Sequence, residues 1–259
     1  MKWILLLLCA SMLTGCNSAV TTNADDEQWI QLFNGKNLDG WDIKIAGYEM
    51  NDNFANTFRV EDGMMKVRYD GYDAFTNQFG HIFYKEKFSH YRLRVEYRIV
   101  GEQLTGGPGW AFKNSGVMFH SQSAASMESD QPCPVSLEGQ FLGGSKELER
   151  YTINLCTPGT NVYIDGELVT QHCYNSTSKT IRGEEWVLAE FVVHGDSIIH
   201  HLVDGDTVLT YNRPVIGGGN KPEGYPIPDG TPLKEGYISL QSESHPVDFR
   251  KVELLDLSK

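Results

Sequence analysis

The stretch Asn114–Gln122, which reads Asn-Ser-Gly-Val-Met-Phe-His-Ser-Gln, has the alternation of a β-strand, and the rest of the fold can be argued outward from it. A period of two places Val117 and Phe119 on one face, where they suit a core. The other face carries an amide, a thioether and an imidazole around a gap: Asn114, Met118, His120 and Gly116. Such a strand suits the floor of a concave sugar site. An ordinary half-buried strand whose histidine is paired with a neighbour would show the same pattern.

Short apolar runs separated by turn dipeptides continue along the chain. Residues 91–100 form the clearest predicted strand, because apolar side chains alternate there with arginine and glutamate. Residues 187–194 and 198–203 predict a hairpin over Gly195-Asp196. We find no segment with a convincing helical period. Many short strands at even spacing therefore predict a single all-β sandwich or jelly roll.

The N-terminal end has the pattern of an export signal, with a lysine ahead of the short apolar run Ile4–Ala10. This run is too short for a permanent membrane helix. The ending Leu13-Thr14-Gly15-Cys16 resembles a bacterial lipobox. We therefore expect a signal peptide over residues 1–15, a lipid on Cys16 and a polar tether over residues 16–28. A plain secretory signal is the alternative. These features predict an anchor in the bacterial cell envelope, at the outer membrane or in the periplasm.

Charge and motifs exclude several classes of protein. The formal net charge is −12, which argues against nucleic acid as a partner. The chain lacks a phosphate-binding loop, a dinucleotide fingerprint, a nucleophile elbow and a His-Glu-x-x-His zinc motif.

Three of the five cysteines lie beyond the predicted leader and lipid site: Cys133, Cys156 and Cys173. An exported protein can hold disulfides. Cys156 and Cys173 flank a predicted hairpin, so we expect them to pair, leaving Cys133 free. Pairing with Cys133 stays open at this stage.

A second strand, Ser136–Leu142, places Glu138 and Gln140 on one face. If that face continues the one that carries His120, an acid, an amide and an imidazole converge. A polar face in contact with water is the alternative.

The third informative stretch is Gly236–Leu255. Gln241 and Glu243 share a face of its first strand, and the following turn presents His245. Arg250 in the last strand would pair with a carboxylate or a sugar hydroxyl. An acidic surface loop with a structural arginine is the alternative.

These stretches, in this order, resemble a known family. The resemblance rests on the opening Leu32–Trp41, the Asn-Ser-Gly-Val-Met-Phe strand, the Glu-x-Gln strand, and the ending with Ile-Ser-Leu-Gln and Val-Asp-Phe-Arg-Lys-Val. The chain is similar to the 3-keto-disaccharide hydrolase domain family over residues 29–257. The resemblance implies a concanavalin A-like jelly-roll sandwich of two antiparallel sheets with a concave site. It also implies oligosaccharides or glycosides oxidised at C3 as substrates.

That chemistry needs one base, because a C3 ketone acidifies the proton on C2. Its removal gives an enediolate, the glycosidic oxygen leaves C1, and water then adds. We predict Glu138 as the base and His120 as the acid or oxyanion donor, with Asn114 and Gln140 orienting hydroxyls. The remaining candidates would line the rim or hold a metal: Gln241, Glu243, His245 and Arg250. A divalent cation such as calcium would suit oxygen ligands, but no sequence pattern shows one.

Two other functions fit the same residues. One is a non-catalytic, surface glycan-binding lipoprotein. The other is an ordinary glycosidase, which would need a second carboxylate about 5–10 Å from Glu138.

Overall fold

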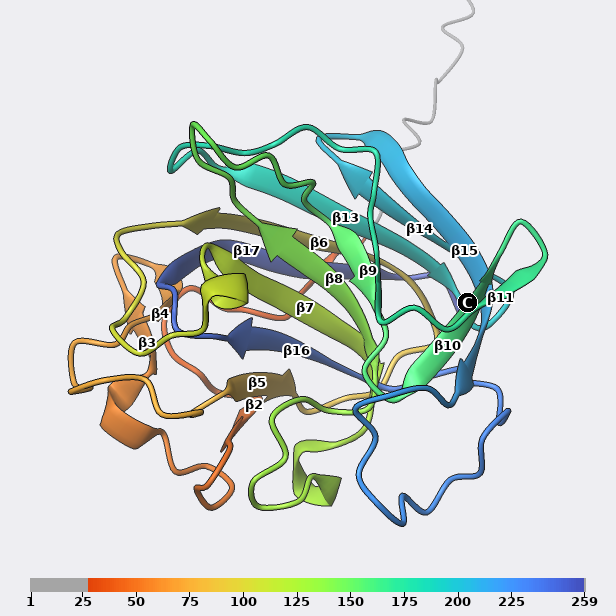
Figure 1. Ribbon diagram of the computed structural model, residues 1–259, viewed down its shortest axis with the longest axis horizontal. Coiled ribbons are helices and arrows are strands. Elements are labelled where there is room, and N and C mark those ends of the chain that lie inside the picture. Colours follow the sequence, from red (N-terminus) through yellow and green to blue (C-terminus); the bar gives the residue numbers. More distant parts are fainter. Residues whose placement is uncertain (1–27, 259) are drawn as a thin grey trace, which may run out of the picture.

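The computed structural model describes residues 28–258 and shows two antiparallel β-sheets packed face to face (Figure 1). Helical structure in these residues is confined to three short 3-10 turns: η1 (Phe54–Asn56), η2 (Gly109–Ala111) and η3 (Ala124–Ser126). The prediction of an all-β jelly-roll sandwich is confirmed.

The larger sheet has ten strands, and β1 (Ile30–Gln31) pairs with β17 beside its main path. The main path runs in the order β11 (Glu167–Val169), β10 (Thr160–Ile164), β15 (Asp206–Ile216), β14 (Ile198–Val203), β13 (Val187–His194), β6 (His90–Ile99), β17 (Val247–Asp256), β4 (Met64–Val67) and β3 (Phe58–Glu61).

The smaller sheet has seven strands and positions the site. Its order is β12 (Cys173–Tyr174), β9 (Asn154–Cys156), β8 (Leu137–Leu142), β7 (Asn114–Ser121), β16 (Tyr237–Ser242), β5 (Gly80–Tyr84) and β2 (Trp41–Ile45). The predicted strand at residues 91–100, the hairpin of β13 and β14, and the strand carrying Glu138 all appear within a residue or so of their expected bounds.

The core lies between the two sheets and is rich in aromatic rings. Tyr97 of β6 stacks on Phe141 of β8 with ring centroids 4.0 Å apart. Phe191 of β13 packs so closely on β8 that a Cβ at Gly139 would lie 2.3 Å from its ring. Gly139 therefore makes room for the core, whereas Gly116 is the glycine that leaves room on the outer face of the small sheet.

The register of the small sheet aligns its outward side chains in rows. Gly116 of β7 is opposite Gln140 of β8, and Met118 is opposite Glu138. On the other side of β7, Met118 is opposite Ser239 of β16. Antiparallel pairing thus brings β8 and β16, far apart in the sequence, to either side of β7 (Figure 1).

A disulfide joins Cys156 of β9 to Cys173 of β12, which are directly opposite each other in the sheet. Among the described cysteines Cys133 is free. Both results confirm the predicted pairing. The predicted signal peptide, the lipid on Cys16 and nearly all of the tether lie outside the described residues. Across residues 28–258, no helix has the length and apolar character needed to cross a membrane.

Candidate active site

A cavity of about 580 Å³ opens on the face of the small sheet that points away from the core. Four of the predicted site residues line it: Asn114, Glu138, Gln140 and Glu243. They come from β7, β8 and the turn after β16, so the cavity exists only because these strands are neighbours. The predicted convergence of the polar faces of three separate strands is thus present, although not with every predicted member.

Glu138 points outward from β8, because Leu137 and Gly139 on either side of it face the core. Its residue is only 6% exposed. Gly116 leaves the space that it occupies, since a Cβ at that glycine would lie 2.7 Å from Glu138 Oε1. Burial raises the pKa of the Glu138 carboxyl to about 8, because little water remains to solvate the charge.

Glu243 is the second buried carboxyl of the site. Gln241 Nε2 donates a hydrogen bond of 2.9 Å to Glu243 Oε1. Burial and, secondly, the charge of Glu138 raise the pKa of Glu243 well above its ordinary value, while the Arg150 guanidinium acts in the opposite direction. Since two neighbouring carboxylates in a dry site cannot easily ionise together, the pair retains a proton at neutral pH.

Gln241 lies between the two acids. Its Oε1 would be 3.3 Å from a Cβ at Gly116, the same point that lies 2.7 Å from Glu138 Oε1. Its amide nitrogen is bonded to Glu243, so the amide oxygen must face the Glu138 side. Gln241 therefore lies near both carboxyl groups, and its hydrogen bond is to Glu243.

Acceptor atoms without a partner within residues 28–258 include Asn114 Oδ1 and Glu243 Oε2 in the cavity lining, and Gln241 Oε1, whose residue is not part of the lining. Leaving a buried acceptor without a hydrogen bond costs about 1–3 kcal/mol. Sugar hydroxyls are donors that would satisfy such atoms. A hard divalent cation would also accept oxygen ligands from this set.

Arg150 is a site residue that the sequence did not reveal. It lines the cavity and donates to the backbone carbonyls of Phe112 and Trp110, the latter at 3.0 Å. These bonds hold its guanidinium in place. Burial lowers the pKa of Arg150, opposed by the charge of Glu243. Arg150 lies in an irregular segment without alternation, so no periodic pattern pointed to it.

An aromatic platform at the cavity mouth is a second feature that we did not predict. Trp110 is 58% exposed and stacks on Phe79, with ring centroids 5.8 Å apart and planes 10° apart. Both rings line the cavity. An exposed tryptophan held flat by a second ring suits the apolar face of a sugar, because the ring is ordered before the ligand arrives.

The wall near β9 and β12 holds the disulfide, together with Cys133, His172 and Asn220. Burial raises the pKa of the Cys133 thiol well above its ordinary value, and the nearby charges of Glu243 and Glu138 act in the same direction. The thiol therefore stays protonated. Cys156, His172 and Cys173 bring one ligand atom each within 4.8 Å of one another. Both cysteines form the disulfide, so neither is available as a thiolate ligand for a metal.

His120 is not part of this site, so the prediction that it shares a face with Glu138 is wrong. Its backbone is left-handed, with φ of 49°, and the β7–β16 register shifts beside it. The bulge breaks the alternation that the prediction assumed. The imidazole instead crosses to the larger sheet, where Nε2 lies 3.0 Å from the carbonyl oxygen of Gly195, and it lines a different pocket.

Arg250 and His245 also lie away from the cavity wall. Arg250 belongs to β17 of the larger sheet, where it pairs with Glu96 and lies over the ring of Trp186. The prediction that it lines the rim is therefore wrong, because its strand belongs to the other layer. His245 is buried behind the site, where Nδ1 accepts a 3.2 Å hydrogen bond from the backbone N–H of Lys113. Its predicted place at the rim is wrong as well.

The fold is a jelly roll, and the cavity on its smaller sheet is lined by carboxyl, amide, guanidinium and aromatic groups. The chain belongs to the family described as the 3-keto-alpha-glucoside-1,2-lyase-like domain, whose model matches residues 28–255. No curated protein matches the chain.

Solved structures share the fold at low sequence identity. A candidate glycosyl hydrolase from Parabacteroides distasonis ATCC 8503 is 19% identical, with a TM-score of 0.55 over 90% of this chain and 95% of its own. A second one from the same organism is 18% identical, with a TM-score of 0.52 over 89% and 100%. The Ca²⁺/Man3GlcNAc-bound exoplasmic/lumenal domain of VIP36 is 10% identical, with a TM-score of 0.50 over 90% of both chains.

Proposed function

We propose that the protein cleaves 3-keto-glycosides by removing the proton from C2, expelling the glycosidic oxygen from C1 and adding water. The observation that carries the proposal is the pair of buried carboxyl groups, Glu138 and Glu243, whose pKa values are both raised, that of Glu243 partly by the charge of Glu138. An elimination needs one base and one acid at the same time, and the pair supplies both when Glu138 is ionised and Glu243 is protonated. Membership of a 3-keto-glycoside lyase-like family supports the same chemistry.

Glu138 acts as the base. The ketone at C3 makes the C2 proton acidic, since the electron pair left behind moves into the carbonyl group. Burial raises the pKa of Glu138 and so makes its carboxylate a stronger base than an exposed one. In this step the C2–H bond breaks, a C2–C3 double bond forms and the C3 oxygen becomes negative.

Glu243 acts as the acid and takes the role that we had predicted for His120. Its pKa is raised by burial and, in addition, by the charge of Glu138, so Glu243 keeps its proton when Glu138 ionises. When the C3 carbonyl re-forms, the electron pair moves into a C1–C2 double bond and the C1–O bond breaks. The departing oxygen takes the proton of Glu243.

Water addition returns both groups to their starting states. The Glu243 carboxylate takes a proton from water as its oxygen bonds to C1, and Glu138 returns its proton to C2. The products are the free alcohol and the 3-keto sugar.

Arg150 stabilises the negative oxygen that forms at C3. It is the guanidinium that lines the cavity, and its bonds to the carbonyls of Phe112 and Trp110 orient it before substrate binds. Because this cation is already oriented, it stabilises the charge of the transition state without a reorganisation cost. The Trp110–Phe79 platform positions the sugar ring above the acids.

The test is incubation of the pure protein with a 3-keto-disaccharide beside the same disaccharide unoxidised. We expect 3-keto-glucose from the oxidised substrate alone, and a loss of at least about 100-fold in kcat for Glu138→Gln. Glu235→Gln is the matched control, because Glu235 is an exposed glutamate outside the acidic cavity. Equal turnover by the Glu138→Gln variant would refute the assignment of the base.

A second candidate is an ordinary glycosidase, which the presence of a second carboxyl, Glu243, favours over a purely binding function. It predicts cleavage of the unoxidised disaccharide, and the same paired assay decides between the two.

We further propose that the protein is lipid-anchored in the cell envelope through Cys16. The support is the lipobox-like sequence alone. Cys16→Ala should move the protein from the membrane fraction to the soluble fraction, and an unchanged distribution would contradict the anchor.

A further inference from the structure

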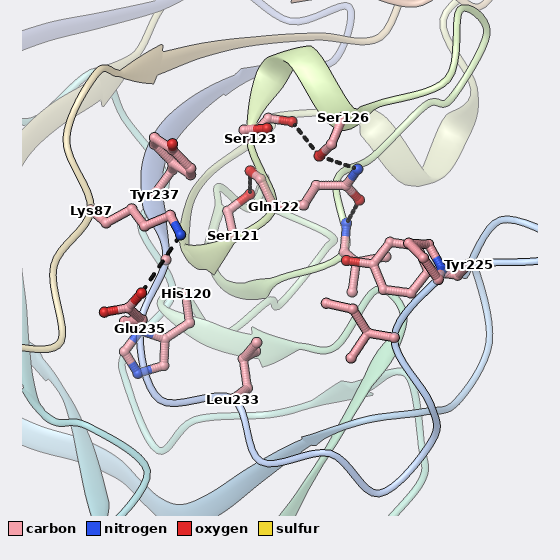
Figure 2. Close-up of a pocket in the computed structure, with 14 residues that line it drawn as sticks. Lys87, His120, Ser121, Gln122, Ser123, Ser126, Tyr225, Leu233, Glu235 and Tyr237 are labelled. Atoms are coloured by element: carbon pink, nitrogen blue, oxygen red, sulfur yellow. Dashed lines mark hydrogen bonds and ion pairs between the residues drawn. The ribbon is translucent and has the colours of Figure 1, made fainter.

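A second pocket lies at the other end of β7, around His120, and the proposed reaction does not use it. Its volume is about 340 Å³, and its walls come from the end of β7, the start of β16 and the long loop that precedes β16. Figure 2 shows His120, Lys87 and Glu235 on one side of the pocket and Tyr225 on the other.

His120 is the unusual residue of this pocket. It is 1% exposed, and its left-handed backbone is strained for a residue with a side chain. Its Nε2 lies 3.0 Å from the Gly195 carbonyl oxygen, which can only accept, so Nε2 carries the hydrogen. Nδ1 is then an acceptor, and in the described part of the chain it has no hydrogen-bond partner. His120 thus combines a strained backbone, a place in the pocket lining and an unpaired buried acceptor, and this combination indicates a site for a hydrogen-bond donor.

The backbone around His120 is built to hold this geometry. A Cβ at Gly236 would lie 2.3 Å from the carbonyl carbon of His120 and 2.5 Å from the backbone nitrogen of Ser121. Any other residue there would push β16 away from the bulge. Burial lowers the pKa of His120 to about 4, so the ring is neutral at neutral pH and its Nδ1 lone pair stays available.

The walls select the class of ligand. Lys87 and Glu235 are the charged side chains among the described lining residues, and they face each other with 3.6 Å between Nζ and Oε1. They neutralise each other, so the pocket favours neither an anion nor a cation. The rest of the lining combines tyrosine rings and aliphatic groups with hydroxyl and amide groups, including Tyr225, Tyr237, Leu233, Gln122 and Ser123. A neutral ring with apolar faces and hydroxyl donors fits these walls.

We propose that this pocket is a second carbohydrate site, which binds one neutral sugar ring of a glycan through a hydroxyl donated to His120 Nδ1 and a ring face packed against tyrosine. A neighbouring hollow of about 650 Å³ shares Ile227, Leu233 and Glu235 with it. A glycan held in the pocket would therefore have this hollow beside it. The site is separate from the acidic cavity and its existence does not depend on the proposed reaction.

The experiment titrates the protein with three unoxidised probes, the methyl glycosides of glucose, galactose and mannose, and follows the histidine ring nitrogens by NMR. We expect at least one probe to shift the His120 Nδ1 signal toward that of a hydrogen-bonded nitrogen. His120→Gln keeps a donor for the Gly195 carbonyl but removes Nδ1, so it should weaken binding by about tenfold or more. Tyr225→Ala should weaken it similarly and leave turnover of a 3-keto-disaccharide unchanged.

Trp110→Ala, in the acidic cavity, is the control and should leave this binding intact. If no probe binds, or if water alone already satisfies Nδ1 and no probe moves its signal, the proposal is overturned. Binding that Trp110→Ala abolishes and Tyr225→Ala spares would overturn it as well, because the sugar would then sit in the other cavity. If His120→Gln does not fold, the wild-type spectra and the Tyr225→Ala variant still test whether the pocket binds sugar. None of these readouts requires turnover.

Discussion

Replacing Glu138 with glutamine should make the protein more stable at alkaline pH and leave its stability nearly unchanged at acidic pH. Burial raises the pKa of this carboxyl from 4.5 to about 8. Between these values the folded protein binds a proton at Glu138 that the unfolded chain does not, so stability falls as pH rises. Glutamine has the same shape and carries no charge, so it escapes the penalty.

The magnitude follows from the pKa shift. Each pH unit inside the window costs the wild type about 1.4 kcal/mol relative to the variant. The advantage of Glu138→Gln should be near zero at pH 4 and should level off above pH 8, at a total on the order of 5 kcal/mol. Removing the charge of Glu138 also lowers the pKa of Glu243, which acts in the same direction, because Glu138 helps to raise it.

The assay is urea unfolding with the disulfide intact, at half-unit steps from pH 4 to pH 9. The unfolding free energy of each variant is compared with that of the wild type at the same pH. Glu235→Gln removes an exposed glutamate and should give a flat difference across the range. If the Glu138→Gln difference is equally flat, Glu138 is not buried in the way the structure describes, and the proposed source of its basicity fails.

Three further predictions test other parts of the structure. Gly139→Ala should destabilise the fold by about 1–3 kcal/mol, because the new methyl group would meet the ring of Phe191 at 2.3 Å; thermal unfolding would show it, and Phe191→Leu should relieve part of the loss in the double variant. Trp110→Ala should raise KM for a 3-keto-disaccharide several-fold, on the order of 1 kcal/mol, with little change in unfolding, since the ring is 58% exposed; an unchanged KM would remove the platform from the site. Replacing Cys156 and Cys173 together by serine should lower the unfolding free energy in urea by about 3 kcal/mol, because the bridge closes a short loop. A variant as stable as the wild type would show that the bridge does not reduce the conformational entropy of the unfolded chain.

Local alternation was enough to predict the layers of the fold. Core-facing and outward-facing side chains alternate with a period of two along β6, β8, β13 and β14. Such alternation is typical of strands with one buried face. The same rule placed Glu138 and Gln140 on the outer face of one strand. The disulfide was predicted on a separate ground, because a hairpin between Cys156 and Cys173 brings its two ends together.

Alternation failed where the backbone departs from an even strand. His120 has the residue type and spacing of a site residue, but a left-handed turn of its backbone sends the ring to the other sheet. Whether a strand bulges depends on the neighbour it pairs with, and here the close approach of Gly236 sets the position of the bulge. Nothing local to residues 114–122 contains that information.

By itself, the sequence of this protein determined an all-β sandwich and an outward-facing Glu138, and it favoured the Cys156–Cys173 bridge, because each follows from periodicity or from short separations along the chain. Only the tertiary structure decided that Glu243 is the partner of Glu138, that Arg150 and Trp110 complete the cavity, and that His120 and Arg250 do not belong to it. The physical reason is that strand order and irregular loops set these contacts across distant parts of the chain, and no pattern within a single segment encodes which strands become neighbours.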